Sequence, residues 1–153
     1  YQRVTMQVNL IPAAEKDREF FRKAHHLAYR DVIEPMFGWD EKKQDHYADI
    51  DFNDRNPHLI QQEDNSVGVI GWQEHEDHIW FGPIFVLPEF QNRGVGSFLV
   101  KKFMEEAEAK NIALRLQTLK MNEGAKKLYE RLGFRVLSSN EIHWQMEYKS
   151  VAK

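Results

Sequence analysis

The sequence contains no cysteine, so disulfide bonds, thiolate metal ligands and a cysteine nucleophile are excluded for these residues. No apolar run approaches the ~20 residues that a membrane-spanning helix requires. The first residues also lack the sustained apolar core of a secretory signal. We therefore expect a cytoplasmic protein that does not interact with membranes.

An excess of positive charge is absent as well. The chain carries 21 Lys and Arg residues against 24 Asp and Glu residues, a formal net charge of −3. Nucleic-acid-binding proteins normally present a basic face, so we expect no nucleic acid partner. Because 42% of the 153 residues are hydrophobic and 12% are aromatic, residues 1–153 fit a single folded domain.

The spacing of apolar residues predicts a mixture of helices and strands. Helical spacing covers residues 14–34, 41–52 and 122–132 and begins again at residue 94. Strands are predicted over residues 6–11, 58–62, 67–73, 78–86, 112–118, 134–137 and 142–148. This order indicates an α/β (α+β) fold in which helices cover both faces of a mixed sheet of about seven strands. Residues 78–86 are apolar throughout, which marks them as the central strand.

A glycine-containing loop follows this central strand and leads directly into a helix. Gly94 and Gly96 lack a Cβ atom, so the backbone can turn tightly and approach a ligand closely. The unpaired N–H groups at a helix start favour a phosphate, and Arg93 adds positive charge. The P-loop pattern GxxxxGK[ST] is absent, and Leu99 stands where the dinucleotide pattern GxGxxG needs its last glycine. An ordinary strand-to-helix turn is the alternative interpretation.

Two motifs resemble one known family. The first is Gln91-x-x-Gly94-x-Gly96 after a Val-x-Pro strand end, and the second is Asn122-x-x-Ala125-x-x-Leu128-Tyr129-x-x-x-Gly133-Phe134. In this order and spacing they resemble the GNAT superfamily of N-acetyltransferases, over residues 66–148. The resemblance implies the GNAT fold and acetyl-CoA as co-substrate. It also implies direct attack on the acetyl group by a primary amine of a small molecule or peptide, within a ternary complex.

The resemblance assigns cofactor contacts to three segments. These residues are Ile84, Phe85, Val86, Gln91, Asn92, Arg93, Gly94, Val95, Gly96, Ser97, Asn122, Ala125 and Tyr129. In the family the strand end parts from its neighbour and pairs with the pantetheine arm. Pro83 fits this expectation because proline removes a ladder hydrogen bond, although a kink without a ligand role would look the same. Asn122 is also a plausible helix N-cap.

The resemblance supplies one catalytic residue and leaves the general base open. Tyr129 matches the tyrosine that donates to the CoA sulfur, and simple packing is its alternative role. Positions where relatives carry a carboxylate or imidazole are Trp80 and Gly82 here, and neither can accept a proton. This departure suggests that a water chain or a residue of the first two helices accepts the proton. Glu34, near the end of the first helix, is a candidate base, and a solvated carboxylate is its alternative role.

Further features are open to two interpretations each. An acidic cluster either steers a cationic acceptor or is a solvated helix face; it comprises Asp40, Glu41, Asp45, Asp49, Asp51 and Asp54. Tyr29, Phe37 and Trp39 either line the acceptor site or belong to the core. We expect one of His25 and His26 to be packed and the other exposed. No HExxH helix is present, so we expect no metal.

Two rival functions remain compatible with the sequence. A non-catalytic acyl-CoA sensor would retain the cofactor loop without a general base. A donor such as succinyl-CoA would need a larger site or a cation near the thioester. A monomer and a homodimer are both compatible with the pattern.

Overall fold

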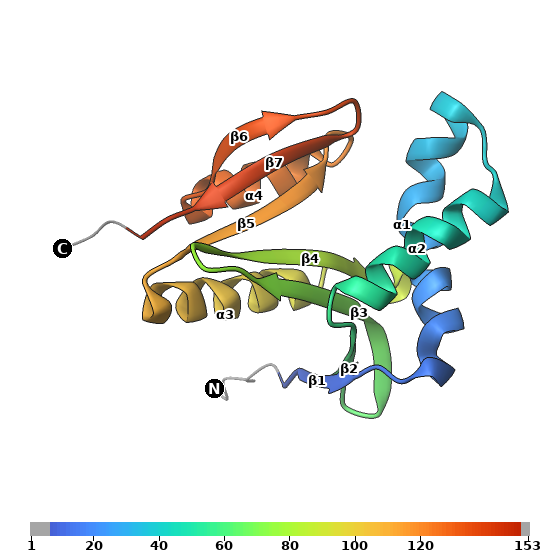
Figure 1. Ribbon diagram of the computed structural model, residues 1–153, viewed down its shortest axis with the longest axis horizontal. Helices are drawn as coiled ribbons and strands as arrows, with labels where there is room; N and C mark the ends of the chain where they lie inside the picture. Colours follow the sequence, from blue (N-terminus) through green and yellow to red (C-terminus); the bar gives the residue numbers. More distant parts are fainter. Residues whose placement is uncertain (1–6, 151–153) are drawn as a thin grey trace. The chain divides into compact units, whose positions relative to one another are not determined.

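The computed structural model describes residues 7–150 and follows the predicted order of elements (Figure 1). Its helices are α1 (Arg18–Phe37), α2 (Glu41–Asp54), α3 (Val95–Lys110) and α4 (Glu123–Leu132), with short 3-10 turns η1 (Glu15–Asp17) and η2 (Pro88–Phe90). Its strands are β1 (Asn9–Pro12), β2 (His58–Gln62), β3 (Asn65–Glu74), β4 (His78–Val86), β5 (Ala113–Leu119), β6 (Arg135–Ser139) and β7 (His143–Tyr148). Within the described residues no helix is both long and apolar enough to cross a membrane.

The strands form one seven-stranded sheet in the order β1-β2-β3-β4-β5-β7-β6. β4 is the middle strand, as its continuous hydrophobicity predicts. It pairs with β5 in parallel, His78 opposite Ala113, whereas β7 is antiparallel to both β5 and β6. The predicted mixed sheet of seven strands with four helices is therefore confirmed for the described residues.

The first helix and the first strand differ most from the prediction, and the helix begins at Arg18 and not at residue 14. The first helix runs through Pro35 and ends at Gly38. The φ of Gly38 is 76°, a value that glycine adopts without steric cost. Pro35 sits in the last turn, where a missing N–H costs one hydrogen bond and the Gly38 N–H still reaches the Glu34 carbonyl. The first strand begins at Asn9, and Met6 lies outside the described residues.

The chain divides into two compact units, each with its own packing. The described part of the first comprises residues 7–71 and 83–96, and that of the second comprises residues 72–82 and 97–150. In the first unit Phe21 is 1% exposed, and its ring meets Phe52 and Phe85 edge-on at centroid distances of 5.5 and 6.3 Å. Such burial contributes roughly 1.5–3 kcal/mol per phenyl side chain, so these rings fasten α1 and α2 to the end of β4.

Two glycines in β3 allow close backbone approach in the first unit. A Cβ at Gly68 would lie 2.3 Å from the Phe85 carbonyl oxygen, and one at Gly71 would lie 2.3 Å from the Arg55 carbonyl oxygen. Real Cβ atoms do not come within 3.0 Å of such atoms. β3 therefore touches the last residues of β4 and the end of α2 only because these side chains are absent.

The second unit is built around α3, α4 and the strands β5, β7 and β6. Phe103 of α3 packs at 5.0 Å on both Trp72 and Phe81. α4 ends at Gly133, whose φ of 106° is left-handed, and the chain then places the Phe134 ring between those of Tyr129 and Tyr148. The predicted helix end at Gly133 is therefore confirmed.

Candidate functional site

The glycine loop has the backbone geometry of an anion site. Gln91 has a φ of −71°, whereas Asn92 and Gly94 have φ values of 62° and 84°. The positive φ values turn the loop sharply just before the helix, whose free N–H groups favour an anion. α3 begins at once with Val95, so the positive end of its dipole faces the same stretch. A Cβ at Gly96 would meet nothing within 4 Å, so the space beside this residue is open.

Side chains within the loop hold its shape. The Gln91 amide donates from Nε2 to the Val86 carbonyl at 2.9 Å and closes the loop onto the end of β4. The Arg93 guanidinium lies 5.6 Å from the centre of the Phe90 ring, an ordinary cation–π distance. Gln91 therefore has a structural role of its own, and Arg93 remains on the exposed side of the loop.

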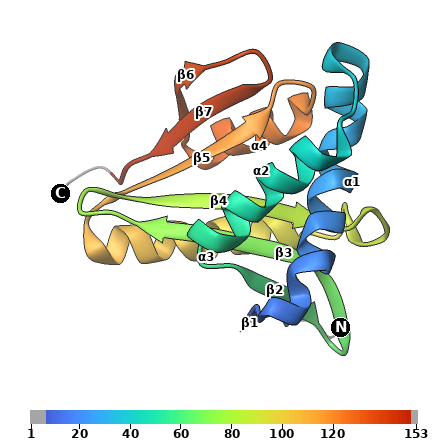
Figure 2. The same ribbon diagram turned by 45° about the vertical axis from the view of Figure 1, so that its right-hand side comes forward.

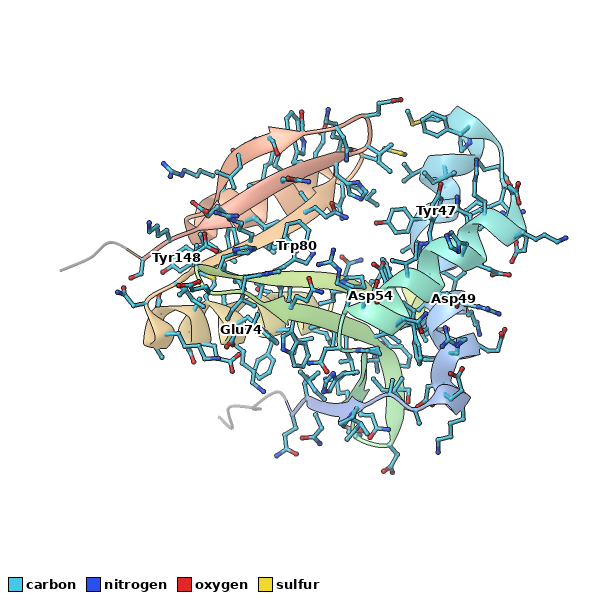
Figure 3. All side chains as sticks on the ribbon, viewed as in Figure 1. Tyr47, Asp49, Asp54, Glu74, Trp80 and Tyr148 are labelled. Atoms are coloured by element: carbon cyan, nitrogen blue, oxygen red, sulfur yellow. The ribbon has the colours of Figure 1, made fainter. Side chains whose placement is uncertain are left out.

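The end of β4 is irregular where the pantetheine arm is expected. Among the described residues, the ladder between β4 and β5 includes only residues 78–80 of β4. Gly82 has a φ of 139°, and Pro83 has no N–H to give to a neighbour. These are the marks of an interrupted strand. A side chain at position 82 would be strained, which accounts for the lack of a carboxylate or imidazole there. Trp80 precedes this break on β4 (Figure 3).

The residues of the second motif lie in the second unit. The Asn122 side chain accepts a hydrogen bond from the Ala125 N–H at 3.0 Å, so its predicted role as N-cap is confirmed. Burial raises the pKa of the Tyr129 phenol above its ordinary value. This phenol therefore stays protonated at neutral pH, as a proton donor must. Its ring also packs on Phe134 at 5.6 Å, so the packing role is real as well.

Glu34 lies in solvent at the last turn of α1. Its side chain is 50% exposed and accepts a hydrogen bond from Arg30, four residues earlier, at 3.1 Å. Exposed pairs of this kind contribute little to stability. Its surroundings therefore resemble the alternative interpretation, a solvated helix-end carboxylate, more than a general base.

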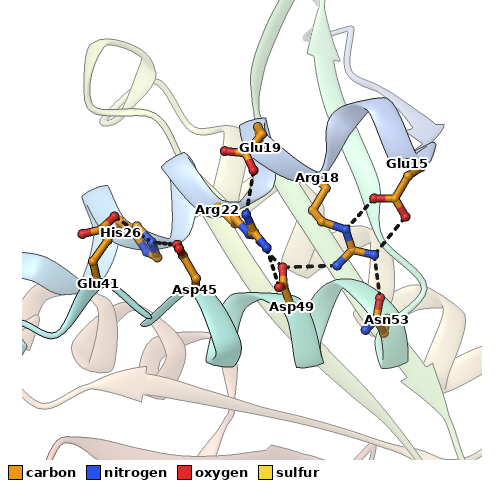
Figure 4. A network of polar contacts seen from close by, with 9 residues as sticks. All are labelled: Glu15, Arg18, Glu19, Arg22, His26, Glu41, Asp45, Asp49 and Asn53. Carbon is orange, nitrogen blue, oxygen red and sulfur yellow. Dashed lines mark hydrogen bonds and ion pairs between the residues drawn. The ribbon is translucent and has the colours of Figure 1, made fainter. Parts of the chain in front are cut away.

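α2 runs alongside α1 (Figure 2), and several residues of the acidic cluster hold the two helices together (Figure 4). Asp49 accepts two hydrogen bonds from Arg22, at 2.9 and 2.6 Å, and lies 3.2 Å from Arg18. Asp40 caps α2 by accepting from the Lys43 N–H. The negative charge of Asp49 is therefore matched locally, which favours the structural interpretation over steering of a cation.

The aromatic residues proposed as site walls have separate surroundings. Phe37 is 59% exposed, and Trp39 packs at 5.2 Å on His26. Tyr29 packs at 5.6 Å on Phe85, and burial raises the pKa of its phenol to about 12. Tyr29 alone of the three therefore lies against the strand segment predicted to bind the cofactor.

A histidine on α1 was not singled out as a site residue by the sequence. His25 is 4% exposed, and its ring lies 4.8 Å from Tyr29 and 5.6 Å from Phe85. Its neighbour His26 is more exposed and bonds to Asp45 of α2 at 2.7 Å. The expectation of one packed histidine is confirmed, and the expectation that the other is exposed is wrong, because the His26 side chain is only 15% exposed. The position of His25 four residues after the buried Phe21 was the available signal.

Comparisons with known proteins give this arrangement a family. The family model described as "Acetyltransferase (GNAT) family" matches residues 20–134. Thialysine N-epsilon-acetyltransferase of Bos taurus is 38% identical over 65 residues, which are 42% of this chain and 38% of that protein. The alignment thus spans well under half of this curated relative.

Solved structures share the fold at low sequence identity. A PaiA N-acetyltransferase from Thermoplasma acidophilum, in complex with coenzyme A, has a TM-score of 0.71 at 14% identity, over 95% of this chain and 100% of that one. The ribosomal-protein-S18-alanine N-acetyltransferase from Escherichia coli has a TM-score of 0.68 at 21% identity, over 96% and 97%. Because the family model also matches well over half of the sequence, the chain belongs to the acetyltransferase (GNAT) family.

Proposed function

We propose that this protein transfers an acetyl group from acetyl-CoA to a primary amine of a small molecule or peptide. The observation that carries the proposal is the loop of residues 91–96, with positive φ at Asn92 and Gly94 and an adjoining helix start. That geometry suits the pyrophosphate of CoA. A coenzyme A complex among the structural relatives supports the same donor.

The acceptor class follows from the chemistry of relatives. The bovine relative is named for acetylating the ε-amine of thialysine, and the Escherichia coli relative for acetylating an alanine amine. Both are aliphatic amines. They are mostly protonated at neutral pH, because the pKa is near ~10 for a side-chain ammonium and near ~8 for an α-ammonium. The site must therefore remove a proton before or during attack.

The proposed reaction needs no covalent enzyme intermediate. The amine nitrogen attacks the thioester carbonyl carbon, and the tetrahedral adduct collapses to the amide as the C–S bond breaks. The leaving CoA thiolate takes a proton, and Tyr129 is the proposed donor. Because burial raises the pKa of this phenol, it holds its proton at pH 7. General acid help of this type is typically worth ~10²–10⁴ in rate, and the low end is expected because a thiolate leaves well unaided.

The loop assignment is tested by adding charge where phosphate is expected. We expect Gly94→Asp and Gly96→Asp to weaken CoA binding at least ~10-fold in calorimetry, or about 1.4 kcal/mol. An acidic residue in the first turn of a helix stabilises it through the dipole. Gly96→Asp should therefore unfold no earlier than the parent while losing affinity. Unchanged CoA affinity in both folded variants contradicts the loop assignment.

An acceptor screen separates the proposed enzyme from its rival. Purified chain and acetyl-CoA are incubated with thialysine, lysine, polyamines and short peptides, and released thiol is measured. Turnover on any amine supports the proposal. CoA binding without turnover on the whole panel supports the acyl-CoA sensor. That rival stands because Trp80 and Gly82 occupy the positions of the general base and neither can accept a proton.

A further inference from the structure

A chain of three hydrogen-bonding side chains connects the core of the first unit with its surface. His25 Nδ1 lies 2.9 Å from His26 Nδ1, and His26 Nε2 lies 2.7 Å from Asp45 Oδ1. His25 is 96% buried, since only 4% of it is exposed, whereas the side chains of His26 and Asp45 are 15% and 33% exposed. The chain thus runs from a buried imidazole to a carboxylate that solvent reaches.

The carboxylate at one end fixes the position of every proton in this chain. Ionised Asp45 can only accept, so Nε2 of His26 carries the proton that it donates. Neutral His26 then presents a bare Nδ1, which accepts the Nδ1–H of His25. Neutral His25 has a single N–H, so its Nε2 is left with a free lone pair.

The ring that carries this lone pair packs among aromatic side chains, and the Tyr29 ring lies 4.8 Å from it. The His25 ring lies edge-on against Phe85, 5.6 Å from its centre. Phe85 belongs to the strand segment proposed to bind the pantetheine arm.

We propose that His25 is the general base of the acetyl transfer and that His26 and Asp45 carry its proton to solvent. This inference rests on the proposed function and adds the residue that the sequence left open. The acceptor ammonium gives one proton to His25 Nε2, and the Nδ1 proton of His25 passes to His26 Nδ1. His25 ends neutral with its tautomer reversed, and His26 becomes an imidazolium.

Two carboxylates lie beside His26. Its Nε2 lies 2.7 Å from Asp45 and 3.6 Å from Glu41, whose other oxygen accepts from the Trp39 indole N–H. His25 has no such partner, and burial, assisted by neighbouring His26, lowers its pKa to about 4. A proton taken up by the buried ring is therefore passed on rather than kept. Release of the extra proton from His26 to water leaves His25 protonated on Nε2. The starting tautomer returns when His25 loses that proton to water and regains one on Nδ1 through His26.

The position of the protons is measurable without any activity. In ¹⁵N-labelled parent protein at neutral pH, two-bond ¹H–¹⁵N spectra distinguish the two neutral imidazole tautomers. We expect His25 with a protonated Nδ1 and a bare Nε2, assigned by the loss of its signals in His25→Gln. A neutral His25 with its proton on Nε2, while His26 is neutral, overturns the proposal. If His25→Gln does not fold, His25→Asn supplies the same assignment.

Turnover provides the second measurement. With an acceptor found in the screen, we expect His25→Gln to lower kcat ~100-fold or more, within the range of general base catalysis, with CoA affinity changed less than ~2-fold. Asp45→Asn keeps an acceptor for His26 and removes the charge. It should lower kcat at neutral pH and move the acidic limb of the kcat profile to lower pH.

The pH profile separates proton transfer from a packing role. The titratable groups around His25 are His26 and Tyr29 on α1 and Asp45 and Glu41 on α2. His46→Gln is the matched control, since this residue of α2 is exposed and its ring lies beside that of Tyr47. It should leave both kcat and the profile unchanged.

Each outcome identifies which proposal fails. An active parent whose kcat and profile survive His25→Gln overturns the base assignment alone, and a profile unmoved by Asp45→Asn overturns the path to solvent. A parent that binds CoA but acetylates no amine overturns the proposed function and this inference together. Loss of parental activity with a chelator, restored by zinc, would show that His26 and Asp45 serve a metal and also overturns the relay.

Discussion

Gly68→Ala tests how closely β3 and the end of β4 must approach in the first unit. The added Cβ would lie 2.3 Å from the Phe85 carbonyl oxygen and 3.0 Å from the Val86 Cα. Contacts below 3.0 Å do not occur for real Cβ atoms, so the backbone must move by at least 0.7 Å, the difference between 3.0 and 2.3 Å. The obstacle is main chain in a sheet, which cannot rotate away as a side chain can.

The expected cost is that of overpacking a buried site, typically 1–3 kcal/mol. For a chain of this size each kcal/mol lowers Tm by roughly 2–4 °C, so a fall of about 2–12 °C is expected. Circular dichroism melts of parent and variant measure it, and urea unfolding supplies the free energies. Because the shift acts on the segment proposed to bind pantetheine, CoA affinity should fall as well.

Gly96→Ala is the matched control for this substitution. A Cβ at Gly96 meets nothing within 4 Å, and alanine in a helix is favoured over glycine by roughly 0.5–1 kcal/mol. Its free energy of unfolding should therefore rise or stay level. Equal stability of Gly68→Ala and the parent would refute the inferred approach of the two strands.

Two further substitutions address the catalytic tyrosine and the ion pairs. Tyr129→Phe keeps the ring and removes the proton donor, so kcat should fall ~100-fold or less while CoA affinity is unchanged. The pH profile of kcat should also lose any alkaline limb that reports the phenol. An unchanged kcat and pH profile would leave Tyr129 a packing residue. Asp49→Asn should lower the free energy of unfolding by about 1–2 kcal/mol at pH 7, because it weakens two charged hydrogen bonds from Arg22. The hydrogen bond from Arg22 lowers the pKa of Asp49, so this stabilisation is present above pH ~4 and is lost as pH falls through the lower folded value. Urea unfolding from pH 7 to pH 2 should thus show a shallower loss for the variant, and parallel curves would contradict the assignment.

Hydrophobic spacing predicted nearly every element, because the fold places its apolar residues at regular intervals. The central strand over residues 78–86 and the helix cap at Asn122 are cases in which the local pattern was sufficient. The end of α1 was harder to place, since Pro35 reads as a stop although a last turn tolerates it. Gly38, which follows, is the residue that ends the helix.

The candidate site was predictable only where its residues are close in sequence. Its glycines predicted the loop of residues 91–97, and a second sequence motif predicted Asn122 and Tyr129 as site residues. The link from His26 to Asp45 joins α1 to α2 and depends on how the two helices align, which no periodicity specifies. His25 carried one usable signal, because it shares a buried helix face with Phe21.

The alignment of α1 with α2 connects stability with the proposed catalysis. Arg18 and Arg22 hold Asp49, and one helical turn toward the N-terminus of α2 Asp45 receives His26 (Figure 4). A slip of the two helices by one turn, ~5.4 Å, would break both sets of contacts together. The arginine pairs therefore do more than add their modest pairwise energies, because they fix the register in which His26 meets a carboxylate. In the proposed relay, that register in turn decides which nitrogen of His25 is bare, and so whether Nε2 is the atom that accepts the proton.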